Sequence, residues 1–236
     1  WLMRAKRSLL GVRSDMQGDE PIRVAVVTGC HPFDVRAFTR LFRELPGIDA
    51  YIQHLDDFVA DVGRARDWYQ AVVFYHFHQE LPDDTAQNPW WRRGVRASLE
   101  RLGTTEQGIV VLHHGLVAYR GWPFWSEVVG IKERGTGFTP DQEIQVQVVD
   151  SQHPITAGVR DWRMVDEVYT IGEPDRPSHV LLATDHPASM RALAWVRHFG
   201  RARVFCYQSG HGDPAFSSPG FRQVLLNGIA WVAHVI

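Results

Sequence analysis

The sequence predicts a three-layer α/β fold, with helices on both faces of a mostly parallel central sheet and an additional antiparallel β extension. Two observations support this fold class. In the first half of the chain, apolar β-branched runs alternate with segments of helical periodicity, which is typical of βαβ units. In the second half, residues 143–149 alternate polar and apolar side chains, which indicates a half-exposed antiparallel strand.

The first half supplies the expected parallel strands. Residues 22–28 form an apolar, β-branched run that Gly29 ends, and residues 33–45 carry apolar side chains at helical spacing. Pro46 and Gly47 then stop this helix. The other elements expected here are strands at 48–55, 71–75 and 108–112 and a helix at 90–102.

The second half is expected to hold shorter strands and a closing helix. The strands are expected around residues 164–171, 179–183 and 192–196, followed by a buried strand at 203–207. Residues 221–235 have the pattern of an amphipathic helix. Because no repeat or obvious linker interrupts the chain, we expect one α/β domain over residues 21–236. Residues 1–20 are expected to form a poorly ordered N-terminal arm.

Composition excludes several classes of protein. The chain has 236 residues, 44% of them hydrophobic, and a net charge of −2, so it carries no basic footprint for nucleic acid. No apolar run approaches the roughly 20 residues that span a bilayer, so we expect no membrane partner. The two cysteines, Cys30 and Cys206, cannot build a disulfide scaffold. We therefore expect a cytoplasmic protein.

Histidines follow the predicted parallel strands at the points where those strands end. In a parallel α/β sheet, ligands bind at the carboxyl ends of the strands. The histidines at such ends are His31, His76, His78, His113, His114 and His211. Imidazole transfers protons near neutral pH and also binds metals, so these residues predict a site at one edge of the sheet.

His113 and His211 are the strongest candidates among these histidines. His113 directly follows a buried strand, at an elbow where a helix dipole would favour a neutral imidazole. His211 lies between Gly210 and Gly212, which permit a close approach of ligand to backbone. The competing interpretations are a histidine hydrogen-bonded inside a tight turn and a solvated histidine in a glycine-rich loop.

The other histidines have weaker support. His76 and His78 share one face of an extended segment and could chelate a metal, but such pairs also occur on strand ends without any role. His31 and His114 are candidate substrate contacts, although each could instead be a structural turn residue.

A carboxylate and a tyrosine in the second half complete the candidate site. On a strand, Glu167 and Tyr169 share a face, and Asp166 points to the opposite one. Glu167 could act as a base, metal ligand or acceptor for sugar hydroxyls, and Tyr169 could stack on a sugar or donate a hydrogen bond. The competing interpretation of Glu167 is a buried carboxylate that holds a loop.

The motifs, taken in order, resemble the ThuA-like (trehalose utilisation) family, a branch of the class I glutamine amidotransferase-like superfamily. The resemblance covers roughly residues 22–234 and rests on these pieces: Thr28, Gly29 and His31; Val111, Leu112 and His113; Asp150 with His153, Pro154, Ile155 and Thr156; Asp166, Glu167, Val168 and Tyr169; Arg203, Val204 and Phe205; Gly210, His211, Gly212 and Asp213; and Trp231. It implies a flavodoxin-like three-layer sandwich and a role in carbohydrate utilisation.

The resemblance also implies what the protein does not do. Class I amidotransferases carry a cysteine nucleophile at the elbow where this chain has His113, so we expect no thiol glutaminase activity. No Gly-x-Gly-x-x-Gly motif follows the first strand, so no nucleotide cofactor is expected.

We therefore predict an enzyme that acts on a sugar or keto-sugar derivative, with His113, His211 and Glu167 as catalytic residues. The expected substrate contacts are His31, His76, His114 and Tyr169. Two chemistries stay open: metal-free acid–base catalysis, or a divalent metal such as zinc held by His78, His113 and His211. The alternative function is a non-catalytic sugar-binding or accessory subunit that works with an oxidoreductase.

The tryptophans, Trp90, Trp91, Trp122 and Trp125 among them, are expected in the core or between copies of a homo-oligomer.

Overall fold

The computed structural model describes residues 20–84, 94–135 and 137–236. Within them lies a mixed nine-stranded sheet, in the order β2-β1-β3-β4-β9-β8-β7-β5-β6. The expected N-terminal arm falls almost wholly outside the described residues, as do Trp90 and Trp91. The strands are β1 (Ile22–Gly29), β2 (Ile48–His54), β3 (Ala71–His76), β4 (Gly108–Leu112), β5 (Gly137–Val148), β6 (Trp162–Thr170), β7 (His179–Ala183), β8 (Ala192–Phe199) and β9 (Ala202–Tyr207).

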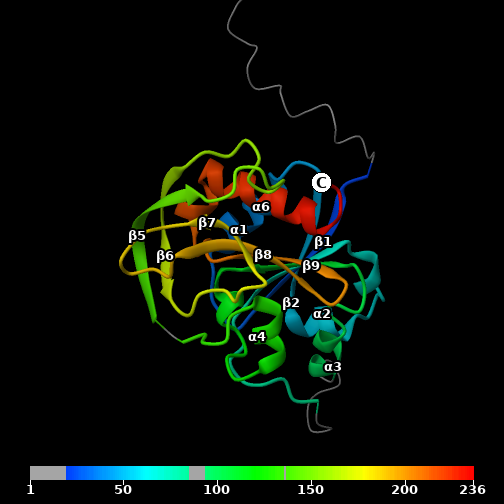
Figure 1. The fold of residues 1–236 in the computed structure, drawn as a ribbon. Coiled ribbons are helices and arrows are strands. Elements are labelled where there is room, and N and C mark those ends of the chain that lie inside the picture. Colours follow the sequence, from blue (N-terminus) through cyan, green and yellow to red (C-terminus); the bar gives the residue numbers. More distant parts are fainter. Residues whose placement is uncertain (1–19, 85–93, 136) are drawn as a thin grey trace, which may run out of the picture.

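Helices cover both faces of this sheet. They are α1 (Val35–Arg43), α2 (Leu55–Ala60), α3 (Val95–Glu100), α4 (Pro123–Val129), α5 (Asp213–Phe216) and α6 (Pro219–Val232), with 3₁₀ helices η1 (Arg66–Trp68) and η3 (His113–Val117). Figure 1 shows α1 and α6 on one face and α2, α3 and α4 on the other. The predicted three-layer architecture is therefore confirmed.

The sheet is parallel in one half and antiparallel in the other. Strands β2, β1, β3, β4 and β9 pair in parallel, whereas β8, β7, β5 and β6 continue the sheet with antiparallel pairings. The parallel half has the 2-1-3-4-5 order of a flavodoxin-like sheet, in which ligands bind at the carboxyl edge where the chain reverses direction across the sheet. The antiparallel half is the predicted β extension.

Two separate cores explain why the parallel strands are apolar on both faces. Val24 and Val26 of β1 pack into the core beneath α1 and α6, while Ala25 and Val27 pack into the opposite core. Side chains alternate between the two faces of a strand, so a strand covered on both sides needs a continuous apolar run. Trp125 and Trp122 lie in the second core, which confirms a core role for them.

Several boundaries differ from the predicted ones for local reasons. The strand expected to reach residue 55 ends at His54, because the His54 side chain caps α2 by accepting a hydrogen bond from the backbone N–H of Asp56. Helices α2 and α5 were not expected. Each is six residues or shorter and buries two side chains, which is too few to give a clear periodicity.

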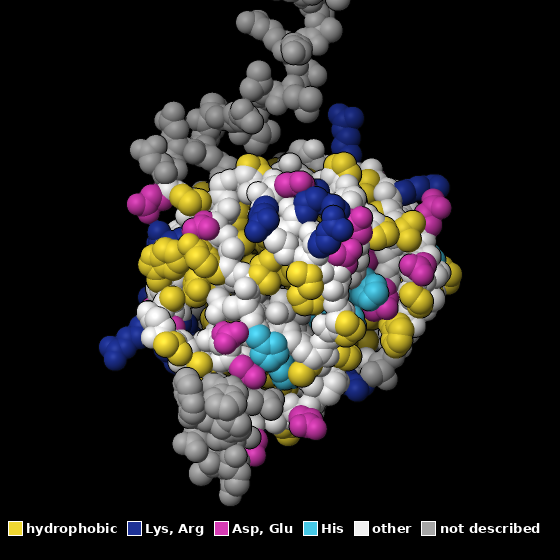
Figure 2. All heavy atoms as spheres, turned by 180° about the vertical axis from the view of Figure 1, so that it is seen from behind, with side chains coloured by type: hydrophobic (Ala, Val, Ile, Leu, Met, Phe, Trp, Pro, Cys, Tyr) yellow, Lys and Arg dark blue, Asp and Glu magenta, His cyan; other side chains and the backbone are white. Residues whose placement is uncertain are grey.

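The surface carries charges of both signs. On the face shown in Figure 2, Lys and Arg side chains lie among acidic ones rather than covering the face. This mixture is what a net charge of −2 implies. None of the described helices is both long and apolar enough to cross a membrane.

Gly228 allows α6 to lie directly on β9. A Cβ atom at this position would overlap the ring of Phe205, which is fully buried and cannot retreat. We expect Gly228→Ala to lower the free energy of unfolding, because overpacking costs about 1–3 kcal/mol and the gain in helix propensity is about 1 kcal/mol at most. Urea unfolding measures this change. Gly63→Ala is the control, since a Cβ there meets nothing within 4 Å. An unchanged or higher midpoint for Gly228→Ala would contradict the close packing.

Candidate functional site

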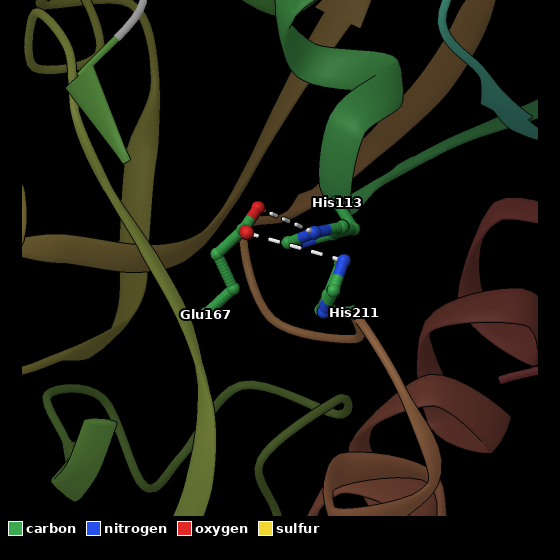
Figure 3. Close-up of side chains that lie close together, drawn as sticks. All are labelled: His113, Glu167 and His211. Atoms are coloured by element: carbon green, nitrogen blue, oxygen red, sulfur yellow. Dashed lines mark ion pairs between the residues drawn. The ribbon is translucent and has the colours of Figure 1, made fainter. Parts of the chain in front are cut away.

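Three of the predicted residues converge at the carboxyl edge of the parallel strands. His113 follows β4, His211 lies in the loop after β9, and Glu167 is on β6 of the extension. Figure 3 shows the three side chains pointing toward one another from these separate elements. One ligand atom from each lies within 4.8 Å of the other two. We refer to these three residues as the triad.

His113 occupies a strained elbow, as predicted. Its φ of 49° lies in the left-handed region, which a residue other than glycine adopts rarely. The element that follows is the five-residue 3₁₀ helix η3 rather than an α-helix, so the expected helix-dipole effect has no basis. A hydrogen bond fixes the ring instead: Nδ1–H of His113 donates to the carbonyl oxygen of Gln208 at 2.8 Å. With Nδ1 as this donor, Nε2 is the ring nitrogen that faces the rest of the triad.

Glu167 lies between the two imidazoles. Its Oε1 is 3.4 Å from His113 Nε2, and its Oε2 is 3.9 Å from His211 Nε2. His113 is fully buried, whereas the His211 side chain is 39% exposed. His211 is therefore the most exposed member of the triad.

Tyr169 shares the Glu167 face of β6, as predicted, and also reaches His113. Its hydroxyl lies 2.9 Å from His113 Nε2, and the two rings stack with centroids 4.8 Å apart. Because Nδ1 of the neutral ring carries the proton, the tyrosine hydroxyl donates to Nε2. Burial and the nearby Glu167 raise the pKa of Tyr169 well above its usual value, so the phenol keeps its proton.

The carboxylate of Glu167 remains charged despite its burial. Burial by itself would raise the pKa of Glu167. The neighbouring side chains of His113, His211 and Tyr169 outweigh burial and lower this pKa. The site therefore combines a fixed negative charge with a protonated phenol at neutral pH.

Asp166 is a residue of the site that the sequence did not single out. It is 4% exposed, and its two oxygens accept backbone N–H groups from Glu167 at 2.9 Å, Gly210 at 2.7 Å and His211 at 3.0 Å. The same loop is held from another direction by Tyr75, whose hydroxyl donates to the carbonyl oxygen of Gly210 at 3.1 Å. Alternation on β6 placed Asp166 on the opposite face from Glu167, but no spacing in the sequence linked it to residues 210–211.

His31 and His114 lie beside the triad and are stacked on each other. Their ring centroids are 4.3 Å apart, and the ring of His31 also meets that of His211 at 5.9 Å. His114 donates Nε2–H to the carbonyl oxygen of Tyr75 at 2.8 Å, and burial holds its pKa well below the usual value. Burial also lowers the pKa of His31. Both rings therefore form an uncharged wall next to the triad.

His76 and His78 are not brought to the triad. His76 is fully buried and packs with Phe74, Tyr119 and Trp125, in the core opposite α1 and α6. Its Nδ1 lies 3.4 Å from that of His78. The expected substrate contact at His76 and the expected shared metal ligand at His78 have no support in this geometry, because alternation along β3 directs His76 away from the face of Tyr75.

The cysteines do not replace the missing elbow nucleophile. Cys206 lies in the middle of the sheet on β9 and is fully buried, and this burial raises the pKa of its thiol. A thiolate would be required for glutaminase chemistry. Because His113 occupies the elbow, we continue to expect no thiol amidotransferase activity, and this stays a prediction.

Comparison with protein families and solved structures adds a context to this geometry. The family model named ThuA and described as trehalose utilisation matches residues 40–232. The fold resembles a ThuA-like protein from Parabacteroides merdae with a TM-score of 0.70 and 20% identity, over 91% of this chain and 90% of that one. No curated protein matches the chain.

Two further solved structures show how widely the fold is shared. A cytoplasmic protein from Salmonella typhimurium aligns with a TM-score of 0.65 and 13% identity, over 89% of this chain and 99% of that one. A glutamine amidotransferase from Thermotoga maritima aligns with a TM-score of 0.57 and 12% identity, over 90% of this chain and 98% of that one. At these identities the comparisons establish the fold, which is that of the glutamine amidotransferase-like proteins.

The buried ring of His76 makes stability depend on pH. Burial, with His78 and His54 nearby, holds its pKa well below the usual value, so the folded chain keeps the ring neutral. The unfolded chain binds a proton there below about pH 6.5, so acidification favours unfolding by up to about 1.4 kcal/mol per pH unit for this residue. Urea unfolding at pH 7.5 and 5.5 should show that His76→Phe has a smaller loss of stability than the wild type. His198→Gln, a substitution at an exposed position, should lose as much unfolding free energy between pH 7.5 and 5.5 as the wild type does. Equal losses in wild type and His76→Phe would rule out this contribution.

Proposed function

Because the chain belongs to the ThuA family, which is described as a trehalose-utilisation family, we propose that it is a carbohydrate-utilisation enzyme acting on a keto-sugar derivative. In the proposed reaction, the enzyme removes a proton from the carbon next to the sugar carbonyl, and His113 accepts that proton. One observation carries this proposal: a hydrogen bond from Nδ1 to Gln208 fixes the His113 ring, and Nε2 then lies beside both a phenol and a carboxylate.

Each residue of the site has a role in this reaction. His113 Nε2 accepts the proton from carbon when the substrate displaces the hydroxyl of Tyr169. The electron pair moves onto the carbonyl oxygen, and the displaced hydroxyl of Tyr169 donates a hydrogen bond to that oxygen. Glu167, which is negatively charged, then stabilises the imidazolium of His113 across 3.4 Å. His211, which is partly exposed, exchanges the proton with water.

The separations within the site favour catalysis over simple binding. A general base and its partner need to lie within hydrogen-bond reach or one water apart. The hydroxyl of Tyr169 satisfies this requirement at 2.9 Å from His113 Nε2, whereas the 3.4 Å and 3.9 Å separations of the triad are longer than a hydrogen bond and shorten only if substrate binding draws the side chains together. A non-catalytic sugar-binding or accessory subunit would need no such convergence, so it remains the alternative that the experiment below distinguishes.

The charges of the site favour a neutral substrate. Glu167 contributes a negative charge, and burial keeps His31 and His114 uncharged. An anionic substrate such as a sugar phosphate would therefore meet repulsion here. We propose an unphosphorylated keto-disaccharide or keto-monosaccharide as ligand, with no nucleotide cofactor, and the cytoplasm as the location.

Proton exchange in D₂O tests this function directly. The chain is incubated with keto-disaccharides, and loss of the proton signal next to the carbonyl is followed by NMR. We expect His113→Gln to slow wild-type exchange by about 10²–10⁴-fold, the usual contribution of a general base. Tyr169→Phe should slow it by about 10²-fold through loss of the oxyanion donor.

His198→Gln is the control and should exchange at the wild-type rate. His198 is exposed and pairs with Arg203 at the start of β9, whereas the loop that carries His211 follows the end of β9. Equal exchange in wild type and His113→Gln would refute the assigned base. Tight binding of a keto-sugar without any exchange would instead favour the non-catalytic alternative.

A further inference from the structure

The geometry points to a mononuclear divalent-metal site formed by His113, Glu167 and His211. It concerns the same residues as the proposed function but goes beyond it: an ion there would polarise the carbonyl of the sugar, and His113 Nε2 would then be a ligand rather than the base, so the metal-bound and metal-free chemistries exclude each other. The predicted ligand set included His78; the structure places Glu167 in that position instead. Two imidazoles and one carboxylate are the ligand set of one class of catalytic zinc sites, with an open position for substrate.

The separations of the three side chains suit one ion. Zinc lies about 2.0–2.2 Å from nitrogen and oxygen ligands, so two ligands of a tetrahedral ion are about 3.3–3.5 Å apart. His113 Nε2 and Glu167 Oε1 are already 3.4 Å apart. His211 Nε2 is 3.9 Å from the other carboxylate oxygen, Oε2, and with one ligand atom from each residue the three atoms lie within 4.8 Å of one another. Binding of one ion therefore requires the partly exposed His211 side chain to move by about 1 Å toward the other two ligands.

The ring of His113 makes the second hydrogen bond that is typical of a metal-ligating histidine. A ligating histidine usually donates its second N–H to a carbonyl or carboxylate, which fixes the ring orientation. His113 does so through Nδ1 to the carbonyl oxygen of Gln208 at 2.8 Å. Gln208 is itself held, since its side-chain amide donates to the backbone carbonyl of Glu167 at 3.2 Å. The two ligands are thus connected by one buried residue.

Tyr169 competes with the ion for the same lone pair. Its hydroxyl lies 2.9 Å from His113 Nε2, so a metal at this nitrogen must displace that hydrogen bond. The released hydroxyl then has Glu167 within reach as an acceptor. Removing the hydroxyl should consequently leave metal binding intact while it impairs proton exchange, and this contrast separates the two proposals.

Asp166 holds two of the three proposed ligands in position. It is buried, and it holds the backbones of both Glu167 and His211 through three N–H groups. We therefore assign Asp166 as the positioning residue of the metal site.

Zinc titration of the full chain without a histidine tag tests this assignment. The protein is stripped with EDTA, and free Zn²⁺ is reported by a competing chromophoric chelator. We expect one zinc per wild-type chain. Loss of a supporting residue costs about 10–100-fold in affinity, so Asp166→Asn should weaken binding by about that factor, and His113→Gln, His211→Ala and Glu167→Gln by more.

Two controls keep the result interpretable. Asp161→Asn also alters a carboxylate that accepts a backbone N–H, that of Val148. Asp161 is exposed and directly precedes β6, about 20 Å along the extended chain from Glu167, so this variant should bind zinc like the wild type. Tyr169→Phe should bind zinc at least as tightly as the wild type. Circular dichroism melts in EDTA verify that each variant is folded.

The outcomes separate this inference from the proposed function. Absence of zinc from the wild type, or full retention of zinc by the folded double variant His113→Gln/His211→Ala, would overturn the metal site. Proton exchange by wild type in excess EDTA would still support metal-free catalysis. Stoichiometric zinc without exchange of any keto-sugar would support the metal site and count against the proposed reaction.

Discussion

Asp166 connects two parts of the protein that the sheet order keeps apart. It is on β6, at the end of the antiparallel extension, whereas Gly210 and His211 follow β9, with β8, β7 and β5 between the two strands in the sheet. Its carboxylate is buried, so each N–H that it accepts would be costly to leave unpaired. The loop must therefore close on β6, and this closure brings His211 to Glu167. The meeting of His211 with Glu167 therefore depends on this set of hydrogen bonds, while His113 is fixed separately by its hydrogen bond to Gln208.

Much of the fold was predictable because local patterns and tertiary structure agree. The apolar run that became β1 is buried on both sides, as a parallel strand requires, and the alternation at residues 143–149 became part of β5 at the less protected end of the sheet. The strand β7 was predicted with its observed bounds. The short helix α2 was not predictable, because it rests on two buried side chains and a histidine cap rather than on a periodic face.

The sequence predicted correctly which residues follow the ends of parallel strands, but it did not predict to which face of a strand each side chain points. His113 and His211 both follow strands of the parallel half, so their convergence follows from topology. His76 also ends such a strand, but the side-chain alternation of β3 directs it into the opposite core. Asp166 was missed since its partners are backbone groups 44 and 45 residues away, which leave no mark in side-chain patterns.

The position of β6 has a consequence for how the protein loses its site. Strand β6 is the last strand in the sheet order and is hydrogen-bonded, among the described strands, to β5 alone, yet it carries Asp166, Glu167 and Tyr169. Edge elements open in local fluctuations whose free energy is lower than that of global unfolding. The site can therefore come apart while the parallel core stays folded. Substitutions in the β5–β6 hairpin can accordingly abolish ligand binding at an unchanged melting temperature, so a thermal melt alone is a poor measure of whether the site is intact.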